Sequence, residues 1–105
     1  MKYNKLVRDK IPNIIKNNKE IPITHIASDE EYWEKLKEKL KEEVDEFLED
    51  DNEKELIDVL EVIDAIYDFK KIDKSELEKL KKEKKEERGG FDNKIILDES
   101  TKSLE

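Results

Sequence analysis

The apolar side chains of this chain fall into two stripes with helical spacing. The first stripe comprises Trp33, Leu36, Leu40, Val44 and Phe47, and the second comprises Leu56, Val59, Leu60, Ile63, Ile66 and Tyr67. Steps of three and four residues predict amphipathic α-helices, over about 29–49 and from about 53 to Lys70. Asp50-Asp51-Asn52 between them is a turn signal, which predicts an antiparallel helical hairpin.

The segments on either side of this hairpin have their own signals. Pro12 sits in the first turn of a short predicted helix over 10–17, and 21–26 is predicted to be extended. Ser28 with Glu31, and Asp73 with Glu76, have capping-box spacing, so a third helix begins near Asp73 and ends at Gly89-Gly90. Residues 91–97 are predicted as a short strand that pairs with 21–26 in a terminal β-hairpin. The expected fold class is an all-α helical bundle.

The composition limits how this fold can be stabilised. The chain has 105 residues, of which 34% are apolar and 50% charged. One small domain over 1–98, with a flexible tail over 99–105, is therefore expected, and its core is too thin to be self-sufficient. We expect a second copy to complete the bundle, in a homodimer or homotetramer.

Composition and charge also exclude several classes of function. With no cysteine and one histidine, thiolate zinc sites, disulfides and multi-histidine metal centres are excluded. No apolar run approaches the roughly 20 residues of a membrane span, and the N-terminus lacks a signal-peptide pattern, so a cytoplasmic location without membrane attachment is expected. Residues 28–68 hold five basic and eighteen acidic groups, a net charge of −13 that disfavours nucleic-acid binding.

Four carboxylates lie where the two helical stripes call for apolar residues. Glu43 falls within the first stripe and Glu46 at its edge, whereas Glu55 and Asp58 fall within and beside the second. The similar pair Glu61 and Asp64 falls on the opposite face. Unpaired buried carboxylates cost several kcal/mol, and a hard divalent cation such as Mg²⁺ or Mn²⁺ would compensate them. The alternative is that these acids pair with nearby lysines on a half-exposed face.

At these residues the sequence resembles the MazG-type all-α nucleoside triphosphate pyrophosphohydrolase superfamily, which is marked by EExxE on one helix and ExxD on the next. Here the motifs are Glu42-Glu43-Val44-Asp45-Glu46 and Glu55-Leu56-Ile57-Asp58. The sequence is also similar, over about 3–97, to a small phosphoribosyl-ATP pyrophosphohydrolase-like branch. The segments that carry this second similarity are YNKLVRDKIP at 3–12 and RGGF at 88–91.

The resemblance implies Mg²⁺-dependent cleavage between the α and β phosphates of a nucleotide, which gives a monophosphate and pyrophosphate. In that pattern Glu43, Glu46, Glu55 and Asp58 are the metal ligands, and we expect Glu43 and Glu46 to be the catalytic residues. Only eight residues separate Glu46 from Glu55, fewer than in longer members of the superfamily, so a smaller or differently shaped pocket is expected.

Basic and aromatic residues are candidates for holding the nucleotide. Arg8 and Lys10 lie with Lys5 in the one clearly positive segment, and Lys84 and Arg88 extend the Leu77/Leu80 stripe of the third helix. Each of these basic groups has solvation at the surface as its alternative. Trp33 could stack on a base, with a place in the core as its alternative.

The leading functional hypothesis is a pyrophosphohydrolase that removes a standard or damaged nucleoside triphosphate from the nucleotide pool. One alternative is hydrolysis of phosphoribosyl-ATP in histidine biosynthesis. Another is a non-catalytic acidic helical module for binding or oligomerisation, in which changing Glu43 and Glu55 to Gln leaves the fold intact. A phosphate-binding regulator that keeps the metal site without turnover lies between these.

Overall fold

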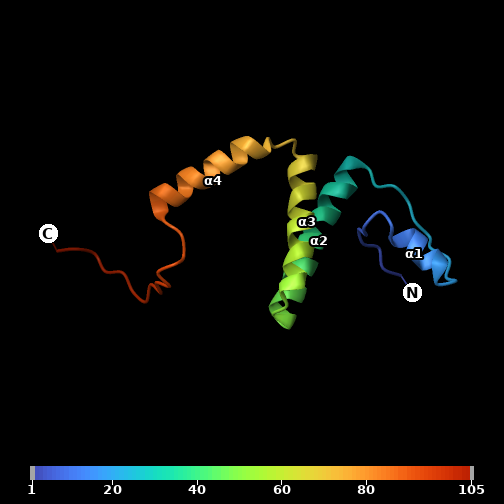
Figure 1. Ribbon diagram of the computed structural model, residues 1–105, viewed down its shortest axis with the longest axis horizontal. Helices are drawn as coiled ribbons and strands as arrows, with labels where there is room; N and C mark the ends of the chain where they lie inside the picture. Colours follow the sequence, from blue (N-terminus) through green and yellow to red (C-terminus); the bar gives the residue numbers. More distant parts are fainter. Residues whose placement is uncertain (1, 105) are drawn as a thin grey trace. The chain divides into compact units, whose positions relative to one another are not determined.

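A computed structural model of the chain describes residues 2–104, and all regular elements in that part are α-helices (Figure 1). They are α1 (Ile11–Asn17), α2 (Asp29–Asp50), α3 (Glu53–Phe69) and α4 (Lys74–Arg88). The predicted all-α class is confirmed, and each expected helix is present within a few residues of its predicted bounds. The chain divides into two compact units, Met1–Ile72 with α1 to α3 and Asp73–Glu105 with α4.

The ends of α2 follow from local chemistry. The Ser28 hydroxyl accepts a hydrogen bond from the Glu31 N–H at 3.2 Å, which satisfies one of the free donors of the first turn. The Glu31 carboxylate contacts His25 Nε2 at 2.7 Å. At the other end, Asp51 adopts a left-handed conformation with φ of 51°, and its N–H donates to the Phe47 carbonyl.

Helix α3 begins directly after this turn and packs along α2 (Figure 1). The Asn52 side chain caps α3 by accepting a hydrogen bond from the Lys54 N–H at 2.9 Å. The turn is short because a left-handed residue and a capping residue together reverse the chain. The predicted hairpin of the two longest helices is therefore confirmed.

The core of this hairpin is small. Leu36 of α2 is 1% exposed and Val62 of α3 is buried. At one end Phe69 stacks against Trp33, with ring centroids 5.7 Å apart, and meets Tyr32 edge to face at 5.3 Å. The face of α3 that α2 covers is centred near Val62, so Leu56 and Leu60 of the predicted stripe are 41% and 60% exposed.

The second unit consists of α4 and the segment that follows it. Asp73 caps α4 by accepting hydrogen bonds from the N–H and the hydroxyl of Ser75. Gly89 ends the helix with φ of 85°, a value that glycine adopts readily. Neither 21–26 nor 91–97 has strand structure among the described residues, so the predicted terminal β-hairpin is not confirmed. Among the described residues, no helix combines the length and apolar character needed to cross a membrane.

Candidate metal centre

Three carboxylates meet where α2 and α3 face each other. Glu43 comes from α2, and Glu55 and Asp58 come from consecutive turns of α3. Each offers one carboxylate oxygen, and these oxygens all lie within 4.8 Å of one another. They converge because Glu43 shares the buried face of Leu36, while Glu55 and Asp58 flank the face of Val62 that packs on α2. The look-alike residues Glu61 and Asp64 are exposed, as the helical period predicts.

Glu43 is the most buried member of this group and is only partly compensated. The residue is 7% exposed, and its Oε1 lies 3.1 Å from Lys39 Nζ. Its other oxygen, Oε2, is buried and has no hydrogen-bond partner. A buried carboxylate oxygen without a partner is costly, so such an atom points to a ligand of opposite charge.

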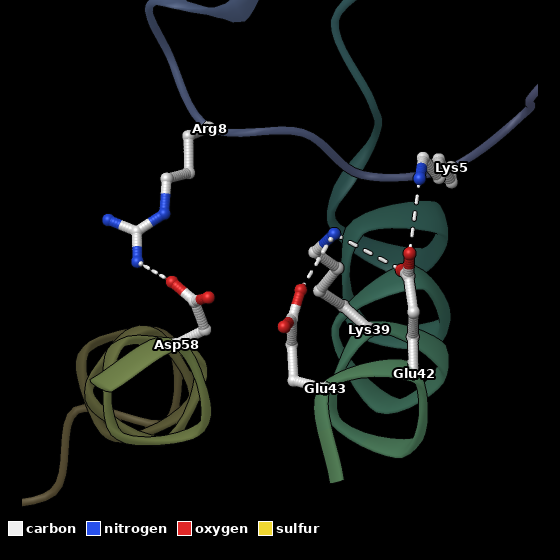
Figure 2. Close-up of polar contacts among 6 residues, drawn as sticks. All are labelled: Lys5, Arg8, Lys39, Glu42, Glu43 and Asp58. Atoms are coloured by element: carbon white, nitrogen blue, oxygen red, sulfur yellow. Dashed lines mark hydrogen bonds and ion pairs between the residues drawn. The ribbon is translucent and has the colours of Figure 1, made fainter. Parts of the chain in front are cut away.

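The N-terminal segment brings further charges to the same place (Figure 2). Arg8 Nη2 donates to Asp58 Oδ1 at 2.8 Å, and Lys5 Nζ donates to Glu42 Oε1 at 3.1 Å. The Asn4 carbonyl accepts a hydrogen bond from Lys35 Nζ at 2.9 Å. Asn4 and Lys5 thus contact α2, and Arg8 contacts α3, beside the three carboxylates.

The electrostatics around Glu42 and Lys39 favour charged forms of both groups. Burial acts to lower the pKa of Lys39, but hydrogen bonds to Glu43 and Glu42 outweigh it and raise that pKa above its usual 10.5. Burial likewise acts to raise the pKa of Glu42, but hydrogen bonds from Lys5 and Lys39 lower it below its usual 4.5. Both groups therefore carry full charge at neutral pH.

Glu46 is not one of the three converging carboxylates, but the negative charges of two of them affect its pKa. Its side chain is exposed one turn beyond Glu43. Desolvation comes first, then the negative charge of Glu43 and a hydrogen-bonding contact with the same side chain, and then the charges of Glu42 and Glu55. Together they raise the pKa of Glu46 above its usual 4.5. An excess of negative charge is therefore concentrated here, and direct coordination by Glu46 stays a prediction.

This donor set fits a hard divalent cation. Carboxylate oxygens are the ligands that Mg²⁺ and Mn²⁺ prefer, and the unpartnered Glu43 Oε2 supplies a buried one. The alternative expected from the sequence is also partly realised, because Lys39 and Arg8 each neutralise one of the acids. These two ion pairs leave Oε2 of Glu43 unsatisfied, so both a cation site and ion pairing stay predictions for this cluster.

The remaining predicted residues lie in several places. Lys10 is exposed at the start of α1. Trp33 is half-buried at the aromatic end of the hairpin, where Phe69 stacks on its ring and Lys70 Nζ lies 4.1 Å from its centroid. Lys84 and Arg88 are exposed on α4 in the second unit. Substrate contact by these four residues stays a prediction.

The contribution of Lys39 was missed by reasoning from the sequence. It lies four residues before Glu43, so one helical turn brings the two side chains together. The helical period that places Glu43 within the first stripe also places Lys39 at the edge of that stripe. This spacing alone could not single out Lys39, because α2 contains several other lysines with similar spacing to acidic residues.

No protein family profile, curated protein or solved structure matches this chain.

Proposed function

We propose that the chain is a Mg²⁺-dependent nucleoside triphosphate pyrophosphohydrolase that releases pyrophosphate and a nucleoside monophosphate in the cytoplasm. The observation that carries the proposal is the buried Oε2 of Glu43, which has no partner within a group of three converging carboxylates. The motifs EExxE and ExxD supply the reaction class by resemblance, and the carboxylate group is where both motifs meet.

Each residue has a defined part in this proposal. Glu43, Glu55 and Asp58 hold the cation, which when bound neutralises phosphate oxygens of the substrate. Glu46, exposed at the edge of the group, accepts the proton of the attacking water or adds a fourth ligand. Arg8, whose side chain is 54% exposed, can turn from Asp58 toward a phosphate, because an exposed ion pair is worth little.

The site for the rest of the nucleotide must be completed beyond the hairpin. A pocket of about 190 Å³ lies between the N-terminal segment and α2, and its lining includes Lys39 and Glu42. Pockets for small molecules usually measure roughly 300–1,000 Å³. This volume is too small for a whole nucleotide, so we propose that a second copy of the chain completes the base site. Lys84 and Arg88 stay predicted contacts for the phosphates.

The test is release of pyrophosphate from a panel of standard and modified nucleoside triphosphates and phosphoribosyl-ATP. Each substrate is assayed with Mg²⁺, with Mn²⁺ and with chelator. For the wild type we expect metal-dependent release from at least one substrate. Glu43→Gln is expected to lower kcat by about 100-fold or more, because it removes a charged ligand at the reacting phosphate.

Glu61→Gln is the matched control. It removes one carboxylate from the same hairpin on the exposed side of α3, so its activity should equal that of the wild type. Turnover of phosphoribosyl-ATP alone would assign the chain to histidine biosynthesis instead of pool cleaning. Pyrophosphate release that persists in chelator or in Glu43→Gln would contradict the metal-dependent mechanism.

A non-catalytic acidic module is the second candidate, and the ion pairs of Lys39 and Arg8 favour it. In such a module these ion pairs neutralise Glu43 and Asp58, and no metal ion binds to them. The chain would then release no pyrophosphate, and Glu43→Gln would fold with equal or higher stability because a buried charge is removed. Isothermal titration with Mn²⁺ separates an inactive metal-binding regulator from a module without a metal site.

A further inference from the structure

Lys39 occupies an unusual position for a basic residue next to a cation site. Its side chain is 16% exposed, and its Nζ lies 3.1 Å both from Glu42 Oε2 and from Glu43 Oε1. Figure 2 shows the ammonium group between the two carboxylates, on the side of α2 that faces the N-terminal segment. Lys39 is thus a permanent positive charge in contact with the most buried carboxylate of the group.

The contact with Glu43 uses only one of its two oxygens. Lys39 engages Oε1, whereas Oε2 has no partner. A divalent cation held by Oε2 would therefore share a single carboxylate with an ammonium group. Like charges on one partly desolvated carboxylate repel strongly, because there is little water between them to screen the interaction.

We propose that Lys39 is an internal counter-cation, which competes with the divalent metal for Glu43 and thereby sets the metal affinity of the centre. This inference rests on the proposed function. It adds that the ammonium group of Lys39 neutralises part of the negative charge of the carboxylates when no metal is bound. Arg8 acts in the same way on Asp58, but more weakly because it is exposed to water.

Two other roles for Lys39 make different predictions. If Lys39 mainly oriented Glu43 toward the metal, its removal would disorder a ligand and weaken metal binding. If Lys39 only stabilised the fold, its removal would lower stability and leave metal affinity unchanged. Competition makes the opposite prediction, because removal of the ammonium leaves Glu43 wholly available to the cation.

The experiment measures Mn²⁺ affinity of the full chain by isothermal titration, with free Mn²⁺ counted by electron paramagnetic resonance. Lys39→Met removes the charge and keeps the length of the side chain, and Lys39→Gln also keeps a hydrogen-bond donor for Glu43. Both variants are expected to bind Mn²⁺ about tenfold more tightly than the wild type at low salt. Lys39→Arg keeps the charge and should restore the wild-type affinity.

Lys35→Met is the matched control. Lys35 lies one turn earlier on α2 and is similarly shielded at 21% exposed, but it bonds to Glu38 and to the Asn4 carbonyl and not to the carboxylates of the centre. Its Mn²⁺ affinity should stay within about twofold of the wild type, because its charge is farther from the cluster and its partners are exposed.

The possible results separate this inference from the proposed function. If the wild type binds Mn²⁺ and both Lys39→Met and Lys39→Gln bind it equally or more weakly, the competition is wrong while the metal centre stands. If neither the wild type nor any variant binds Mn²⁺, the metal centre itself is wrong, and the competition falls with it. Where Lys39→Met loses its helical circular dichroism, Lys39→Gln decides, since it retains a donor for Glu43.

Discussion

At the scale of single residues, the molecule balances buried or crowded charges with close partners. Glu43 is an example, since a carboxylate at a buried helix position is expensive and Lys39 compensates one of its oxygens. Glu42 shows the same principle nearer the surface, where two lysines hold the pKa of one acid below its usual value against the opposing effect of burial. Basic side chains therefore compensate some of the acidic oxygens around Glu43 but not all of them.

Asp73 gives a prediction about pH at this scale. Hydrogen bonds from the Ser75 hydroxyl, and then from the N–H groups of Ser75 and Glu76, lower the pKa of Asp73 below its usual 3.8. Because the folded pKa lies below the unfolded one, the capping contribution is complete above the unfolded pKa. It is lost as the pH falls through the folded pKa.

Ser75→Ala should move the Asp73 pKa upward toward 3.8, because it deletes the first of these donors. The measurement is an NMR titration of the Asp73 carboxyl carbon in the two proteins. Ser100→Ala, in the C-terminal tail, is the control for the loss of one hydroxyl. An unchanged Asp73 pKa in Ser75→Ala would contradict the assigned cause.

At the scale of elements, α2 and α3 depend on each other more than on their own propensities. Their caps at Ser28, Asp51 and Asn52 fix where each helix begins and ends, and a side-chain cap of this kind is worth about 1 kcal/mol. Most of the remaining stabilisation comes from the narrow strip where the two helices touch. This strip contains Leu36 and Val62, and Glu43 lies in it as well.

Leu36→Ala tests how much the strip contributes. Leu36 is the most buried side chain in the described part of the molecule, so its truncation leaves a cavity and should cost about 2–5 kcal/mol in the free energy of unfolding. Urea unfolding followed by circular dichroism measures this cost. Leu104→Ala is the control, since Leu104 is fully exposed, and a similar loss in both variants would refute the packing assigned to Leu36.

At the scale of the whole molecule, a single copy leaves much apolar surface in water. Leu48 of α2 is exposed, and so are Leu56, Ile57 and Leu60 of α3, where Leu60 is a surface neighbour of the other two at spacings of four and three residues. Contiguous exposed apolar patches on helices commonly mark interfaces. We therefore keep the homodimer or homotetramer as a proposal, with this face of α3 as the contact.

Leu60→Glu tests the interface. Leu60 is 60% exposed in one copy, so the substitution should leave the single chain folded. In a dimer or tetramer it would bury a charge, and should raise the dissociation constant at least about tenfold. Sedimentation velocity over a range of concentrations measures this, with Leu104→Glu as the same change at an exposed site. A monomeric wild type, or no effect of Leu60→Glu, would refute this interface.

The amino-acid sequence by itself determined where the helices lie and which carboxylates of α3 face α2. Apolar spacing, Ser28, Asn52 and Asp73 are local signals, and local signals act through neighbours within one or two turns. For that reason the four helices and the preference for Glu55 and Asp58 over Glu61 and Asp64 could be predicted from the chain alone. The strands expected at 21–26 and 91–97 are absent from the described residues. Their β-branched residues fit an extended conformation, but they do not ensure a partner strand.

The tertiary structure decided which charges meet. Arg8 and Asp58 are 50 positions apart, and no periodic pattern links them. Which side of α3 is covered depends on how α2 lies against it. For this reason Val62 is buried, whereas Leu60, which belongs to the predicted apolar stripe of the same helix, is exposed. Likewise, Glu43 has one oxygen paired and one unpartnered only because packing excludes water there. Periodicity fixes the face on which a residue lies, but the contact between faces fixes its partners.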